Sequence, residues 1–170
     1  MSLTTISIII ATVVYVAYNA ISLAYFKVPH SLSETYYLWK ERSNKGFLFP
    51  CMMYVMVSCM MPAWIGMSEG SNFQFLAFLA PASLAFVATA PAFKSSDLEN
   101  NVHTISAYIA AACSLAWVGV VTPYWLVILI WLAVVALASY LTKTIKTSLV
   151  YWLETIAIGA TFTSAIIYSL

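Results

Sequence analysis

The sequence predicts an all-α membrane protein, a bundle of six transmembrane helices that forms one transmembrane domain over residues 1–170. Three observations predict this fold class. Of the 170 residues, 63% are hydrophobic and only 8% are charged, whereas soluble domains carry roughly 25% charged residues. The apolar residues form continuous runs, where the strands of a membrane barrel would alternate. Six of these runs approach the ~20 residues that a helix needs to span a bilayer.

The same composition excludes several classes of protein. A soluble globule or a disordered chain would need far more charge, and seven Lys and Arg are too few for a nucleic-acid-binding surface. The three cysteines lie inside apolar runs, which argues against a disulfide framework. The sequence has no P-loop, and no lysine lies inside an expected span. We therefore predict no cofactor and expect membrane lipids as partners.

The six expected spans follow one another with short connections. The first run has no cation before it and is longer than the core of a signal peptide, so we expect it to be retained as a helix. Thr122 and Pro123 leave almost no loop between the fourth and fifth spans, which predicts a tight hairpin. The expected spans are residues 3–26, 47–67, 73–93, 102–121, 123–141 and 148–170.

The first connection is the longest and contains a helix-start signal. Ser31-Leu-Ser-Glu34 has the form of a capping box, and it predicts a short helix that ends near Gly46. Aromatic residues followed by Lys40 and Arg42 would place this helix in the headgroup region of the membrane. A second capping box, Ser96-Asp-Leu-Glu99, precedes the fourth span.

The cations predict the orientation of the bundle. All of them fall in the first, third and fifth connections: Lys27, Lys40, Arg42, Lys45, Lys94, Lys143 and Lys146. The opposite face, which holds both termini, carries no Lys or Arg. The positive-inside rule makes the cationic face cytoplasmic, so both termini are predicted to lie on the non-cytoplasmic side.

Glu154 is the one acidic side chain well inside an expected span. A carboxylate there costs on the order of 3 kcal/mol, so something must compensate for it. One face of its helix carries a stripe of small and polar side chains, and one face of the first helix carries a similar stripe. The two stripes are Glu154, Ala157, Thr161, Ser164 and Tyr168, and Thr12, Tyr15, Asn19 and Ser22. Glu154 and Asn19 each lie about 12 Å below the cationic boundary, so we expect them to meet.

The third and fourth spans carry small residues at helical spacing. Such faces let helix backbones approach closely in lipid. They comprise Ala77, Pro81, Ala85 and Ala88 on the third span, and Ser106, Ala110 and Ser114 on the fourth. The sequence therefore predicts that these two helices pack tightly.

Other motifs are weaker. The pairs His30 with Glu34 and Glu99 with His103 have the four-residue spacing of a metal site, although residues at a membrane interface are more often solvated or cap helices. Met52, Met56 and Met60 form a stripe that suits Cu(I) but is more typical of adaptable core packing. Gly66-Met-Ser68-Glu-Gly70 matches the nucleophile-elbow pattern, but both histidines are expected on the other face.

Two strings of residues resemble a known group. Val28-Pro-His-Ser-Leu-Ser-Glu-Thr-Tyr-Tyr-Leu-Trp39 is one, and Pro91-Ala-Phe-Lys94 with Val102-His103 is the other. They resemble small six-helix bacterial integral membrane proteins with no established activity, and the likeness extends over most of the chain. The resemblance implies a bacterial cytoplasmic membrane and no particular substrate.

Four functional hypotheses follow. The first is a polar pocket in the cytoplasmic half that binds a lipid-like or small amphipathic ligand; its expected residues are Glu154, Asn19, Thr161, Tyr15, Ser106 and His103. The second is an enzyme that acts on a membrane-dissolved substrate, with Glu154 and His103 as acid and base. The third is a small proton-coupled transporter with Glu154 as the proton carrier. The fourth is a structural partner subunit.

Overall fold

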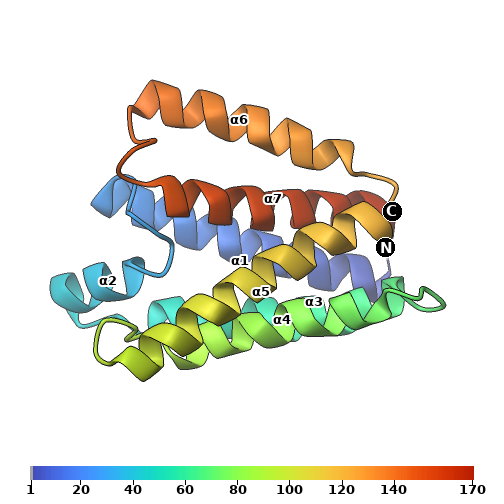
Figure 1. Ribbon diagram of the computed structural model, residues 1–170, viewed down its shortest axis with the longest axis horizontal. Helices are drawn as coiled ribbons and strands as arrows, with labels where there is room; N and C mark the ends of the chain where they lie inside the picture. Colours follow the sequence, from blue (N-terminus) through green and yellow to red (C-terminus); the bar gives the residue numbers. More distant parts are fainter. Residues whose placement is uncertain (1) are drawn as a thin grey trace.

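The computed structural model describes residues 2–170, and these residues form seven α-helices and no strand (Figure 1). Six of the helices correspond to the six expected runs, and the seventh is the short helix of the first connection. In chain order they are α1 (Leu3–Phe26), α2 (Thr35–Ser43), α3 (Leu48–Met67), α4 (Gln74–Thr89), α5 (Asp97–Val120), α6 (Leu126–Thr142) and α7 (Leu149–Ser169). The all-α class is confirmed.

The helix ends follow local chemistry. The bounds of α1 agree with the expected run, and the Ser2 hydroxyl caps its start by accepting a hydrogen bond from the Thr5 N–H at 3.1 Å. α4 ends at Thr89, earlier than expected, because Pro91 disfavours helical dihedrals in the residue that precedes it. α5 begins at Asp97 because Ser96 accepts from the Glu99 N–H. The second capping box therefore opens the helix instead of preceding it.

The capping box of the first connection acts one residue off its expected register. Ser31 Oγ accepts from the Glu34 N–H at 3.1 Å, but Glu34 Oε2 accepts from the His30 N–H at 2.9 Å. This arrangement closes a turn before the helix, so α2 begins only at Thr35. It ends before Gly46 because Asn44 adopts the left-handed conformation, with φ at 57°.

Five helices form a closed ring. α1 contacts α3, α3 contacts α4, α4 contacts α5, α5 contacts α7, and α7 returns to α1, while α6 packs mainly against α7 outside the ring. The most extensive contact is between α4 and α5. It buries Ala77 and Ala110 among other small residues, so the predicted close packing of these two helices is confirmed.

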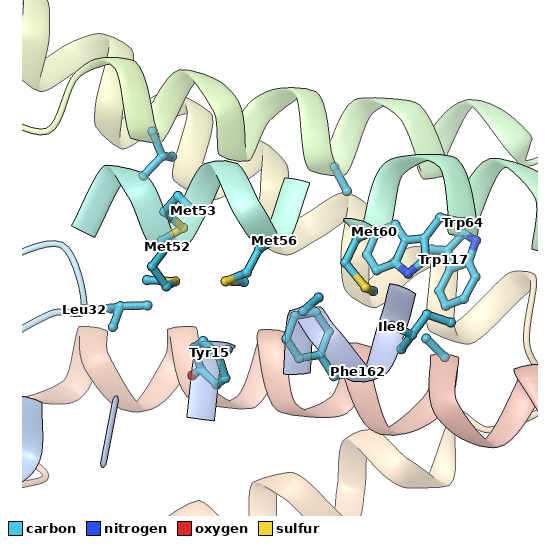
Figure 2. Close-up of a cluster of buried hydrophobic side chains, with 14 of the residues drawn as sticks. Ile8, Tyr15, Leu32, Met52, Met53, Met56, Met60, Trp64, Trp117 and Phe162 are labelled. Carbon is cyan, nitrogen blue, oxygen red and sulfur yellow. The ribbon is translucent and has the colours of Figure 1, made fainter. Parts of the chain in front are cut away.

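Large apolar side chains point into the ring. Figure 2 shows Met52, Met56 and Met60 in a row along α3, on the side that faces α1 and α7. Trp117 of α5 is fully buried and stacks on Trp64, with ring centroids 4.8 Å apart. The methionine stripe is thus part of the hydrophobic core, which is the common use of this adaptable side chain.

Gly159 sets the distance between α6 and α7. A Cβ atom at this position would lie 2.7 Å from the Trp131 ring, and that ring is held by a hydrogen bond from its Nε1 to Thr163 Oγ1. We expect Gly159→Ala to lower the free energy of unfolding by about 1–3 kcal/mol, the usual effect of overpacking. Thermal unfolding of the purified protein in detergent measures this change.

Gly119→Ala is the matched control for this substitution. A Cβ atom at Gly119 meets nothing within 4 Å, and alanine is the better helix former. We expect its unfolding temperature to be unchanged or slightly raised. If Gly159→Ala and Gly119→Ala lowered the unfolding temperature equally, the contact between Gly159 and Trp131 would not limit how closely α6 approaches α7.

Four helices are long and apolar enough to cross a membrane, namely α1, α3, α5 and α7, and α4 and α6 are shorter apolar helices. These helices indicate a multi-pass membrane protein. The three connections that carry all seven cations lie at one end of the bundle, and both termini lie at the other end (Figure 1).

Candidate functional site

A cavity lies inside the helix ring, between α3, α4, α5 and α7. It has about 60 Å³ of space for water, where one water molecule needs roughly 10–15 Å³. Its lining is mostly apolar: Leu32, Met53, Met56, Val57, Met60, Trp64, Pro81, Leu84, Val87, Ala107, Ala110, Ala111, Ala157, Ile158 and Phe162, with Ser33, Ser114, Glu154 and Thr161 as the polar exceptions. Along α3 the lining runs from Met53 to Trp64, a rise of roughly 16 Å.

The cavity lining reaches the outside of the bundle. Six of the lining residues are partly exposed: Val57 on α3, Leu84 on α4, Ala107 and Ala111 on α5, and Glu154 and Ile158 on α7. The α5 pair and the α7 pair each have the four-residue spacing of one helix face. The sides of such apolar helices are where a membrane-spanning protein meets lipid.

Glu154 lies at the end of the cavity near the cationic connections. Its Oε2 accepts a hydrogen bond of 2.7 Å from the Leu32 N–H, so the carboxyl group satisfies a backbone donor of the first connection. The His30 carbonyl accepts from the Tyr151 N–H at 3.0 Å, and the Val28 carbonyl accepts from Ser148 Oγ. The first connection is thereby fixed against the first turns of α7, with Glu154 at the junction.

The opposite end of the cavity is closed by the stacked indoles of Trp64 and Trp117. Trp117 Nε1 donates to Ser68 Oγ at 2.7 Å, and Trp64 lines the cavity. The indole N–H of Trp64 is buried and has no hydrogen-bond partner among residues 2–170. The serine of the G-x-S-x-G string therefore serves as an indole acceptor, at the end of the bundle away from His103.

The structure brings together only some of the expected site residues. Glu154 and Thr161 both line the cavity. Asn19 is buried between α1 and α7, where it donates to the Tyr15 carbonyl and accepts from the Tyr151 hydroxyl at 3.2 Å. The expected meeting of Asn19 with Glu154 is thus replaced by a bond to a residue one turn earlier on α7. Tyr15 packs edge-on against Phe162, and Ser106 is buried on α5.

His103 belongs to a cluster that the sequence does not reveal. Its Nε2 lies 2.8 Å from Ser33 Oγ, and its Nδ1 lies 2.9 Å from the Ala90 carbonyl oxygen. Phe93 stacks on the imidazole ring at 4.6 Å. Ser33 is the residue after Leu32 and lines the cavity. The partner of His103 is therefore Ser33, and no spacing along the chain indicates a pair 70 residues apart.

The four weak metal candidates do not gather at one site, and His103 is bonded to Ser33 and Ala90. Glu34 pairs with Lys94 Nζ at 3.1 Å, Glu99 accepts from the Ser95 hydroxyl, and His30 is exposed. In the part of the chain that the structure describes, no group of three or more His, Cys, Asp or Glu side chains gathers in a metal-binding arrangement.

Comparison with protein-family models, with curated proteins and with solved structures gives no match to this chain. The functional proposal therefore rests on the cavity, its polar end and its partly exposed lining.

Proposed function

We propose that this protein binds a lipid-like or small amphipathic molecule that enters the cavity sideways from the membrane. The observation that supports this function is the cavity itself, an apolar channel with one carboxyl group at its end. The apolar part of the ligand would lie along the methionine side of α3. Methionine side chains adapt readily to a new shape, so the cavity can widen around an alkyl chain.

The polar end determines which headgroup fits. Glu154 accepts one hydrogen bond from the Leu32 N–H, and a carboxyl group has further acceptor capacity. A ligand amine or hydroxyl would donate a hydrogen bond to that free acceptor, whereas a ligand carboxylate has no hydrogen to donate. The ligand is therefore an amphipathic amine or alcohol. The stacked indoles at the far end favour this function over a transporter, because a transporter needs a path to both faces.

The membrane arrangement is part of the proposal. All six long apolar segments cross the bilayer, and α4 and α6 do so as the two shortest spans. The cationic end faces the cytoplasm by the positive-inside rule, and α2 lies in the headgroup region there. The aromatic side chains beside its cations support this placement, since Arg42 lies over the Tyr25 ring at 4.6 Å. The membrane is a bacterial cytoplasmic membrane.

Cysteine labelling tests the orientation. We expect the Ser2→Cys variant to react with an impermeant maleimide that is added on the non-cytoplasmic side. The Asn44→Cys variant should react only with maleimide that is added on the cytoplasmic side. The variants are built in a background in which Cys51, Cys59 and Cys113 are replaced by serine, because Cys51 is exposed. Labelling of position 2 from the cytoplasm would overturn this orientation.

Photo-crosslinking tests ligand binding. A fatty amine that carries a diazirine on its alkyl chain is the probe, and a fatty acid of equal length is its comparison. We expect the amine to label cavity residues of α5 and α7, and the acid to label them at least 10-fold less. Labelling that is absent from these helices would contradict the proposed function.

Ala111→Leu tests whether the ligand occupies the cavity. Ala111 lines the cavity and is partly exposed, so the larger side chain has room to fill the ligand's space. We expect amine labelling to fall at least 10-fold while the unfolding temperature is retained. Ala112→Leu, on the exposed side of the same helix, is the control and should label as the wild type does. Equal labelling of the two variants would place the ligand elsewhere.

A further inference from the structure

His103 and Ser33 form a hydrogen-bonded pair whose proton positions follow from their neighbours. The Ala90 carbonyl oxygen can only accept a hydrogen bond. It lies 2.9 Å from His103 Nδ1, so in the neutral imidazole Nδ1 carries the hydrogen. The lone pair is then on Nε2, and Ser33 Oγ, 2.8 Å away, donates its hydrogen to it.

This arrangement is that of an activated nucleophile. A serine hydroxyl that donates to a histidine, with the histidine oriented by a third group on its other nitrogen, has the three parts that nucleophilic catalysis requires. Here the third group is a backbone carbonyl, and the Phe93 ring stacked on the imidazole restricts its rotation further. The Ser33 and His103 side chains are held rigidly, since the two residues are only 3% and 5% exposed.

The pair lies where a cavity ligand would meet it. Ser33 lines the cavity, and the preceding residue donates its N–H to Glu154. A ligand whose amine or hydroxyl reaches Glu154 thus places the adjoining part of its structure beside Ser33. This end of the cavity is also the end with the cationic connections, where the bundle meets water.

We propose that Ser33 and His103 are the nucleophile and the general base of a membrane esterase that cleaves an acyl ester of an amphipathic alcohol. The proposal rests on the proposed function, because the cavity must first bind the ester. It changes the expected enzyme chemistry: the base is His103, but its partner is Ser33, and Glu154 binds the headgroup.

The reaction balances with water as the only co-reactant. Ser33 Oγ attacks the ester carbonyl carbon, and its proton passes to His103 Nε2. The bond to the alcohol oxygen breaks, and the alcohol leaves with that proton. Water then attacks the acyl-serine and gives a proton to Nε2, the bond between Oγ and the acyl carbon breaks, and Ser33 regains the proton. The products are one fatty acid and one alcohol, and the cavity has room for the water.

An alkyl fluorophosphonate tests the pair on the full-length protein in detergent, because it forms a covalent bond with an activated serine and releases fluoride. We expect mass spectrometry to find the adduct on Ser33. His103→Asn retains a side-chain N–H for the Ala90 carbonyl but lacks the base, so adduct formation should slow at least 100-fold. Ser33→Ala should form no adduct, and Ser58→Ala, an exposed position on α3, should react as the wild type does. The rate of hydrolysis of a long-chain nitrophenyl ester should be highest in the wild type and Ser58→Ala, at least 100-fold lower in His103→Asn, and absent in Ser33→Ala.

Crosslinking of the diazirine fatty amine separates the two proposals. Ser33→Ala and His103→Asn should retain it, because neither change fills the cavity. If Ser33 of the wild type forms no adduct while the amine still crosslinks, the esterase is overturned and ligand binding stands. If Ser33 forms no adduct and the amine does not crosslink, both proposals are overturned. An adduct that forms equally fast in His103→Asn also overturns the role of His103.

Discussion

Glu154→Gln is expected to weaken binding of the fatty amine while the protein stays folded. The glutamine amide oxygen can still accept the hydrogen bond from the Leu32 N–H, so the first connection remains fixed to α7. A hydrogen bond to a charged group contributes about 1.5–3 kcal/mol, so affinity should fall about 10–100-fold. Competition with the diazirine fatty amine measures the affinity, and thermal unfolding in detergent measures the fold.

Glu154→Leu separates the two roles of this side chain. It leaves the Leu32 N–H without its acceptor, and an unpaired buried amide costs about 1–3 kcal/mol. We expect this variant to lose both stability and amine binding, whereas the glutamine variant loses binding alone. A glutamine variant that matches the wild type in stability, amine affinity and proton flux would show that Glu154 is only a structural hydrogen-bonding group.

Trp117→Ala is expected to have the largest effect on stability of any single substitution considered. The Trp117 side chain is 0% exposed, stacks on Trp64 and donates to Ser68. Removing such a side chain from a packed core costs about 3–5 kcal/mol. We expect a large drop in the unfolding temperature in detergent and a loss of folded protein from the membrane.

Trp125→Ala is the matched control, because that tryptophan is 55% exposed. Its replacement should change the free energy of unfolding by no more than about 0.5 kcal/mol. If the two variants unfold at the same temperature, the Trp64 and Trp117 stack does not stabilise the closed end of the cavity.

Much of the fold could be predicted from the sequence because lipid imposes a simple rule. Backbone groups in a bilayer must be paired within a helix, so each long apolar run, such as that of α1, had to be helical. The small faces of α4 and α5 likewise predicted their contact. The helix ends were less predictable, since they depend on single hydrogen bonds such as the one between Ser96 and Glu99.

The site was only partly predictable. Glu154 could be found because a carboxyl group in an apolar run is costly, and Thr161 follows it on one helix face. Ser33 could not be found, because it is a small residue in a connection, and only the closing of the ring brings it to His103. The serine that the motif search found, Ser68, has an indole as its partner instead of a histidine.

The fixation of residues 28–32 by α7 constrains the order in which the protein can be assembled during synthesis. α7 follows all the other helices along the chain, and it is also the helix that joins α5 back to α1. Until α7 has left the ribosome and entered the membrane, the ring is open and the Leu32 N–H has no carboxyl group to bind. The cavity and its polar end are therefore completed only when α7 inserts, and a chain whose α7 has not yet inserted would hold an open ring.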